Sequence, residues 1–146
     1  MKLEALLKTK LVLSLLSLLF VTTFGQTISQ PNSIKDITNN KYALVNLLNG
    51  IKSENDGVRR SSIYFAGKYR NSDTEQVLIE QLKEEQNPSN RILIALVLYK
   101  LGSADGLLEV KKLAANDDNQ KVRTMSTHIY NEYLTRDSKM KLTFRN

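Results

Sequence analysis

The sequence predicts an all-α protein, an α–α superhelix built as a short solenoid of three helix–turn–helix repeats. Three observations predict this fold. Segments that begin with asparagine and end with arginine recur every 32 residues, at 55–59, 87–91 and 119–123. Apolar residues around them recur at three- and four-residue spacing, which is helical. One of the helices so defined, at residues 92–99, has no polar side chain until Tyr99.

The three asparagines predict where the second helix of each repeat begins. An asparagine before a helix accepts a hydrogen bond from a free backbone N–H in the first turn. Pro88 follows Asn87 directly, where proline suits a helix start. We therefore expect helices to begin near residues 56, 88 and 120. In the first of them we expect one apolar stripe to face inward: Val58, Ser62, Phe65 and Tyr69.

A shorter first helix precedes each of these second helices. Its apolar stripes are Leu44, Leu47, Leu48 and Ile51; then Leu78, Ile79 and Leu82; then Leu107, Val110 and Leu113. Residues 72–75 fit a capping box for the second stripe. Gly102 stands just after residue 101, where a helix end favours glycine. The repeats are thus expected at 41–70, 71–102 and 103–134.

The apolar helix at residues 92–99 indicates which repeat lies in the middle. A helix that is apolar on all sides must be covered on all sides. In a linear stack only an inner repeat has neighbours on both flanks, and terminal repeats carry a polar outer face. The order of repeats along the chain is therefore expected to be their order in space.

The N-terminus has the parts of a secretory signal peptide. Lysines are followed by an apolar run from Leu11 to Val21, and then by Thr23 and Gly25 at the small-residue positions of a cleavage site. We expect residues 1–25 to be removed, which makes the protein periplasmic or secreted. An uncleaved anchor is the alternative, although the run is shorter than the ~20 residues a membrane span needs. Residues 26–40 are then a polar leader and residues 135–146 a basic tail.

Composition narrows the possible functions. The chain has no cysteine, which excludes a lipid-anchored cysteine, disulfides and thiolate metal sites. Without residues 1–25, 18 basic and 14 acidic residues remain, a charge of about +4. These charges are interspersed, unlike the clustered basic surface of a nucleic-acid-binding protein. We expect no nucleic acid as partner, and no stable membrane insertion after cleavage.

The repeated pattern resembles the HEAT family, in particular the short bacterial repeats of the phycobilisome-lyase HEAT-like type. The unit of that family has an apolar helix ending in leucine, an acidic turn, then valine–arginine, a small residue and glycine. Leu113, Asp117 and Val122-Arg123 match it best, and residues 51–67 and 82–102 also match. The resemblance covers residues 41–134 and implies a superhelical fold that binds proteins.

The resemblance also implies a ladder of stacked ion pairs. In the family, an aspartate six residues before the arginine belongs to this ladder. The matching pairs are Glu85–Arg91 and Asp117–Arg123, whereas Ser53 stands at that position in the first repeat, beside Glu54. An arginine fork suits carboxylates of neighbouring turns. We expect these arginines to stabilise the stack rather than to bind a ligand.

No catalytic or metal-binding constellation is visible, so we expect neither an enzyme nor a cofactor. His128 is the only histidine, too few for a zinc site. Asp117 and Asp118 suit the start of a helix through its dipole, whereas calcium would need six or more oxygen ligands. No glycine-rich phosphate loop and no Gly-x-Ser-x-Gly nucleophile elbow occurs.

Two functions remain from different classes. One is an interaction module that binds a protein or peptide on its concave face; the other is a structural or accessory subunit of a cell-envelope assembly. The 32-residue spacing defines a candidate partner-binding patch on the second helices: Arg60, Tyr64, Lys68, Ile92, Leu96, Lys100, Thr124, His128 and Glu132. The alternative is that Tyr64, Ile92 and Leu96 only pack between adjacent helices.

Overall fold

The computed structural model describes residues 39–143, which form six α-helices and one short 3-10 helix. The helices are α2 (Ala43–Ile51), α3 (Asp56–Lys68), α4 (Glu75–Glu84), α5 (Pro88–Leu101), α6 (Ala104–Asn116) and α7 (Gln120–Thr143), with η2 (Ser72–Thr74) before α4. No residue between 39 and 143 lies in a β-strand, and the predicted all-α class is confirmed. The predicted signal peptide and most of the predicted leader lie outside the described residues.

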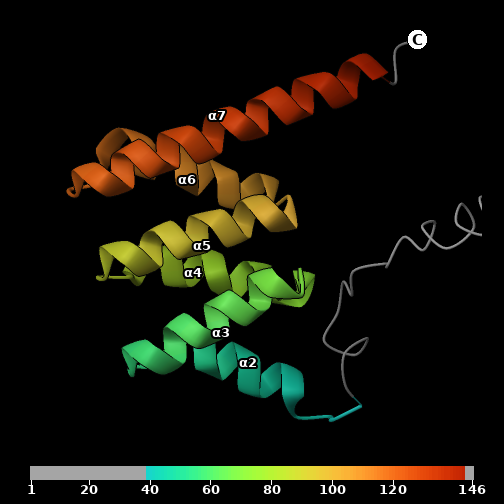
Figure 1. Cartoon of the computed structure of the whole chain (residues 1–146). Helices are drawn as coiled ribbons and strands as arrows, with labels where there is room; N and C mark the ends of the chain where they lie inside the picture. Colours follow the sequence, from blue (N-terminus) through green and yellow to red (C-terminus); the bar gives the residue numbers. More distant parts are fainter. Residues whose placement is uncertain (1–38, 144–146) are drawn as a thin grey trace, which may run out of the picture.

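The helices stack as three successive pairs in two layers (Figure 1). Within the pairs, α2 packs on α3, α4 on α5 and α6 on α7. Between the pairs, α3 contacts α5 and α5 contacts α7, while α4 contacts both α2 and α6. One layer therefore consists of α2, α4 and α6, and the other of α3, α5 and α7. This is the predicted α–α superhelix.

The ends of the second helices are fixed by the residues that the sequence singles out. Asn55, Asn87 and Asn119 each accept hydrogen bonds from backbone N–H groups of the following turn, at 2.9–3.2 Å. The helix starts expected near 56, 88 and 120 are thus confirmed. Gly102 ends α5 in the left-handed conformation, with φ 74°, which glycine adopts without strain.

The predicted capping box at residues 72–75 does not form. Asn71 caps this segment instead, and its side-chain oxygen accepts a hydrogen bond from the N–H of Asp73 at 3.1 Å. The Thr74 hydroxyl donates to the carbonyl of Asn71 at 2.7 Å. The side chain of Thr74, the N-cap of α4, makes no capping bond. The short 3-10 turn therefore takes the place of a simple helix start.

The core lies between the two layers and is densest around α5. Six residues of α5 are buried: Asn90, Arg91, Ile94, Ala95, Val97 and Leu98. The four apolar ones belong to one core cluster with buried residues of the first-helix layer, among them Leu78, Leu82 and Leu107. The sequence correctly identified the middle of the stack, because α5 is the second helix that has neighbours on both flanks.

The last helix is longer than its two counterparts. α7 continues to Thr143, so most of the segment expected as a basic tail prolongs this helix. Figure 1 shows α7 running past the edge of the stack. Among the described residues, none of the helices combines the length and the apolar character that a membrane crossing requires.

Candidate interaction surface

The nine residues of the predicted patch occupy three adjacent helices of one layer. Arg60, Tyr64 and Lys68 lie on α3; Ile92, Leu96 and Lys100 lie on α5; Thr124, His128 and Glu132 lie on α7. Because α3 contacts α5 and α5 contacts α7, the three rows are neighbours. Seven of the nine side chains are exposed, and those of Ile92 and Leu96 are half-buried. The sequence spacing thus predicted which residues share this layer.

The α3 row carries the exposed aromatic group of the patch. Tyr64 is 52% exposed. Its ring meets that of Phe65 edge-on, with 5.6 Å between the ring centroids, and Phe65 in turn stacks on Tyr69 at 6.2 Å. The Lys68 ammonium lies 5.3 Å from the centre of the Tyr69 ring. This aromatic cluster is held on a regular helix, which limits the entropy that its side chains would lose on binding.

In the α5 row, Ile92 and Leu96 are less exposed than the side chains of the α3 and α7 rows. Leu96 packs against the hydrophobic core, so part of its side chain already has a structural role. Arg60 reaches across from α3, and its Nη1 donates to the Oδ1 of the buried Asn90 at 3.2 Å. The packing alternative for Leu96 is therefore partly correct. In this row a partner could contact the exposed part of Leu96 and, one turn further on, the exposed Lys100.

One group of residues lies differently from the prediction. Val58 and Phe65, expected to face inward, are 48% and 44% exposed. Ile63 and Ala66 of the same helix are fully buried in their place. The predicted stripe is therefore only partly correct: Ser62 and Tyr69 are half-buried, and Ser62 lies against Gly50 of α2. The presence of Ile63 between two polar neighbours was the available signal.

The repeated arginines form a ladder, but with partners other than those predicted. Arg59 Nε donates to Glu85 Oε2 at 2.6 Å, and Arg91 Nη2 lies 2.9 Å from Asp117 Oδ1 and 2.7 Å from Asp118 Oδ1. Arg59 and Arg91 thus each pair with acids of the following helix pair, and Arg59 also lies 2.9 Å from Asp56 Oδ1 of its own helix. The predicted side-chain pairs Glu85–Arg91 and Asp117–Arg123 are wrong, because the turn six residues before each arginine offers it backbone carbonyls instead.

Those carbonyls hold the three guanidinium groups in the same way. The Nη1 of Arg59, Arg91 and Arg123 each donates to the carbonyl oxygens five and six residues earlier, at 2.6–3.3 Å. This leaves the other side of the fork for the next helix pair. Arg123 stands at the end of the ladder, and among residues 39–139 no carboxylate forms an ion pair with it.

The two ladder carboxylates in the interior are held in their charged form. Burial raises the pKa of Glu85, but the hydrogen bonds from Arg59 and from the N–H of Asn87 outweigh it, so this pKa lies below its ordinary value. For Asp117 burial also acts upward, and the hydrogen bonds from Arg91 and from the N–H of Asn119 bring the pKa below its ordinary value. The ladder is thus a set of charge-assisted bonds across the stack.

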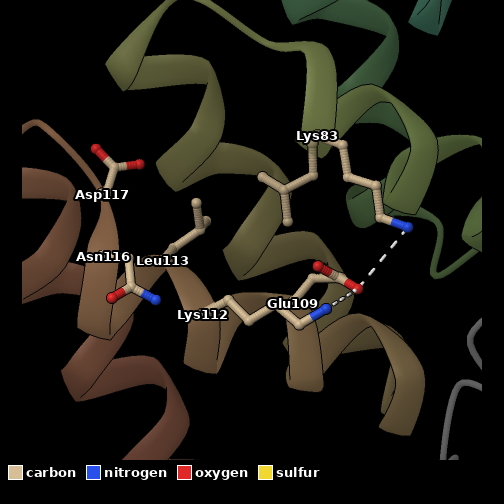
Figure 2. A pocket seen from close by; sticks show the side chains of 7 residues that line it. Lys83, Glu109, Lys112, Leu113, Asn116 and Asp117 are labelled. Carbon is tan, nitrogen blue, oxygen red and sulfur yellow. Dashed lines mark hydrogen bonds and ion pairs between the residues drawn. The ribbon is translucent and has the colours of Figure 1, made fainter.

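The opposite layer has a hollow of its own. A depression of about 210 Å³ lies between α4 and α6, lined by Leu82, Leu113, Asn116 and their neighbours (Figure 2). Glu109 at its rim pairs with Lys112 at 2.9 Å and approaches Lys83 at 3.8 Å. Asp117, which also lines the hollow, pairs with Arg91 of the ladder. Among residues 39–139 no group of three or more histidine, cysteine, aspartate or glutamate residues is placed to hold a metal ion.

Comparison with known proteins agrees with this architecture. No curated protein and no solved structure matches the chain. A family model described as HEAT repeats matches residues 44–129, which span α2 to the first half of α7. HEAT repeats are generally non-catalytic and commonly mediate protein interactions. The chain belongs to the HEAT-repeat family.

Proposed function

We propose that this protein is an exported module of three HEAT-like repeats that binds a protein or peptide on the layer formed by α3, α5 and α7. The observation that carries the proposal is the exposed Tyr64 on a regular helix, with the basic residues Arg60 and Lys68 one turn away on either side. Aromatic and arginine side chains are the commonest anchors of protein interfaces. A stack of helices presents such anchors on one continuous concave surface.

The charge of this surface suggests the character of the partner. Arg60, Lys68 and Lys100 are exposed on α3 and α5, and Glu132 at the far side of α7 is the acidic member of the patch. A positive surface attracts acidic partners and accelerates their approach. We therefore expect a protein or peptide with acidic residues around an apolar anchor.

Export rests on the sequence of residues 1–25, and so does the periplasmic or secreted location. Intact mass of the protein from the exported fraction tests it, with a mature chain beginning at Gln26 as the expected result. Retention of Met1 together with residence in the membrane would contradict it. The assignment to the phycobilisome-lyase type of HEAT repeat rests on the pattern around Asp117 and Arg123 and implies no tetrapyrrole chemistry, because fold alone does not carry function.

The binding surface is tested with a partner captured from an envelope extract, identified by mass spectrometry and then purified. Tyr64→Ala should weaken binding at least tenfold, and Lys100→Glu should weaken it by a smaller factor, with unchanged unfolding midpoints. Leu96→Glu should also weaken it, but its stability must be measured first because Leu96 packs on the core. Lys83→Glu and Lys111→Glu, on α4 and α6 of the opposite layer, are the controls. Loss of binding in the controls alone would move the interface to that layer.

The second candidate, a structural or accessory subunit of an envelope assembly, is favoured by a different observation. Val58 and Phe65 are exposed on the flank of α3, at the end of the stack, where a subunit could be held. Such a subunit would have no independent ligand site. Val58→Asp would then release it from its assembly, while Tyr64→Ala would leave the assembly intact.

A further inference from the structure

The arginine ladder ends at Arg123, where one side of the guanidinium group has no acid to bind. The Nη1 of Arg123 donates to the backbone carbonyls of residues 117 and 118, at 2.6 and 3.1 Å. Arg59 and Arg91 are clamped in the same way, and their Nη2 atoms bind carboxylates of the following helix pair. The Nη2 of Arg123 has no such carboxylate among residues 39–139. Its guanidinium is thus held as in the ladder, but without the acid.

The chain leads away from this open position. α7 continues from Arg123 to Thr143, a distance of about 30 Å at 1.5 Å per residue. Figure 1 shows this part of α7 running past the edge of the stack. None of the helices between residues 39 and 143 packs as a further pair on α6 and α7, where the next acid of the ladder would lie. Another molecule can occupy this place.

The first end of the stack, formed by α2 and α3, carries the complementary group. Glu54 stands two repeats of 32 residues before Asp118, which binds Arg91 at 2.7 Å. The side chain of Glu54 is exposed, and in the described part of the chain no lysine or arginine pairs with it. The chain therefore has a ladder arginine without an acid at its last end and a ladder acid without an arginine at its first end.

A second pair of equivalent positions matches in the same register. The Nη1 of Arg60 on α3 donates to Asn90 on α5, so these two positions meet across neighbouring helix pairs. Their equivalents at the two ends are Thr124, two repeats after Arg60, and Val58, one repeat before Asn90. Thr124 lines a shallow depression of about 470 Å³ at the start of α7. Val58 is 48% exposed, whereas Asn90 is fully buried.

We propose that a second copy of this chain stacks head to tail on the end formed by α6 and α7, so that Arg123 of one copy binds Glu54 of the next. Val58 of the next copy then lies over the depression beside Thr124. The contact continues the ladder between two molecules in the register that it has within one. It joins different surfaces of the two copies, so it gives short linear chains rather than a closed dimer.

Charge favours this orientation over two copies that meet through like ends. The start of α7 carries Lys121 and Arg123, and the turn before α3 carries Glu54 with Asp56 close by. Head-to-tail stacking brings opposite charges together, whereas either end meeting its own kind brings like charges together. The backbone clamp on Arg123 also lowers the entropy that its side chain would lose on binding. Because exposed ion pairs contribute little, we expect a dissociation constant of about 0.1–1 mM.

Charge reversal at the two ends tests the contact in the exported protein, whose N-terminus is checked by intact mass. Sedimentation between about 10 µM and about 2 mM should show reversible association of the parent. Arg123→Glu and Glu54→Arg should each weaken it about tenfold or more, because each places like charges together. An equimolar mixture of the two variants should associate within about threefold of the parent, because each end then meets an opposite charge on the other variant. Asp105→Arg, an equal reversal at an exposed position of α6, should associate like the parent.

The mixture separates the contact from a folding defect, because one misfolded variant does not rescue another. A parent that stays monomeric over this range would overturn the proposal and leave the last end to a different protein. Single variants that associate like the parent would also overturn it, and so would a mixture that fails to recover association.

The absence of cysteine from the chain permits a second test, of the orientation of the two copies. Val58→Cys mixed with Thr124→Cys should give a mixed disulfide dimer, identified by intact mass, because a disulfide needs Cα atoms within about 7 Å. Its yield should exceed that of Val58→Cys mixed with Asp105→Cys about tenfold. Equal yields in the two mixtures, or disulfide dimers of Val58→Cys alone in the same yield, would contradict the head-to-tail contact.

Discussion

The helices α3 and α5 occupy equivalent places in neighbouring pairs, yet they are buried to very different extents. α5 lies between α3 and α7 and buries six residues, including the polar Asn90 and Arg91. α3 has α5 on one flank, and on the other it exposes Val58 and Phe65. At the position equivalent to Val58, α5 has the polar Asn90, yet Asn90 is buried and Val58 is exposed. Place in the stack, rather than local apolar content, decides burial in a linear repeat protein.

The largest expected effect contrasts the centre of the stack with its first helix. Leu98→Ala should lower the free energy of unfolding by about 2–5 kcal/mol, because it empties a fully buried site. Leu98 Cδ2 would lie 2.7 Å from a Cβ on Gly106, so α6 packs tightly on this side chain. Leu44→Ala, at a half-buried position of α2, should cost clearly less. Urea unfolding of both variants measures the difference, and equal losses would contradict the order of the stack.

Arg91→Ala, in the ladder, should have the next largest effect, a loss of about 3 kcal/mol in the free energy of unfolding. Arg91→Ala removes hydrogen bonds to charged groups and leaves the buried Asp117 carboxylate without its cation. Arg123→Ala should cost about 1 kcal/mol, since Arg123 bonds to backbone carbonyls and pairs with no carboxylate among residues 39–139. Thermal or urea unfolding measures both.

A double-mutant cycle locates the partner of Asp117. Asp117→Ala should be non-additive with Arg91→Ala, because the two side chains contact each other directly. Its coupling to Arg123→Ala should be smaller, because Arg123 contacts the backbone of residue 117 rather than its side chain. If Asp117→Ala coupled more strongly to Arg123→Ala than to Arg91→Ala, the pairing of Asp117 with Arg123 that the family resemblance implies would be correct.

Most of the fold could be predicted because it depends on local signals. The asparagine caps, Gly102 and the three-residue and four-residue spacing each act within one helix, and together they locate the second helices correctly. The partners of Arg59 and Arg91 could not be read in this way. Their acids stand 26 residues further along the chain, so the pairing depends on how one helix pair lies on the next.

The candidate surface, too, could be predicted only in part from the sequence. The register predicted which nine residues share the layer of α3, α5 and α7, because a constant spacing brings equivalent positions together. It did not reveal that Leu96 is half-buried while Tyr64 is exposed, since these equivalent residues differ in the number of flanking helices. Val58 and Phe65 were assigned to the core for the same reason. Both residues lie on a flank of α3 against which no second helix of the described residues packs.

A smaller effect on stability is expected at the contact between α3 and α5. Gly67→Ala would place a Cβ 2.5 Å from Val97 Cγ2. Overpacking of this kind costs about 1–3 kcal/mol, and the better helix propensity of alanine offsets about 1 kcal/mol. We expect a net loss of about 1 kcal/mol in urea unfolding. Ser61→Ala, on the exposed side of the same helix, should be neutral or slightly stabilising. A stabilised Gly67→Ala variant would mean that α3 and α5 are less closely packed than described.

The smallest effect is a dependence on pH that links the same helix pairs. The pKa of Glu85 and the pKa of Asp117 both lie below their ordinary values of 4.5 and 3.8, because arginine and backbone donors outweigh burial. A carboxyl group whose pKa is lower in the folded state stabilises that state above its unfolded pKa, and this contribution is lost as pH falls through the folded pKa. The urea midpoint should therefore stay level from pH 7 to about 5 and fall below about pH 4.5.

Amide variants separate this contribution from the general effect of acid. Glu85→Gln keeps the shape of the side chain but cannot ionise, so it should be less stable than the parent at pH 7 and lose less on acidification. Glu132→Gln, exposed on α7, should follow the parent profile and serves as the control. If Glu85→Gln showed the same decrease below pH 4.5 as the parent, the ion pair between Arg59 and Glu85 would not be what joins the first helix pair to the middle one.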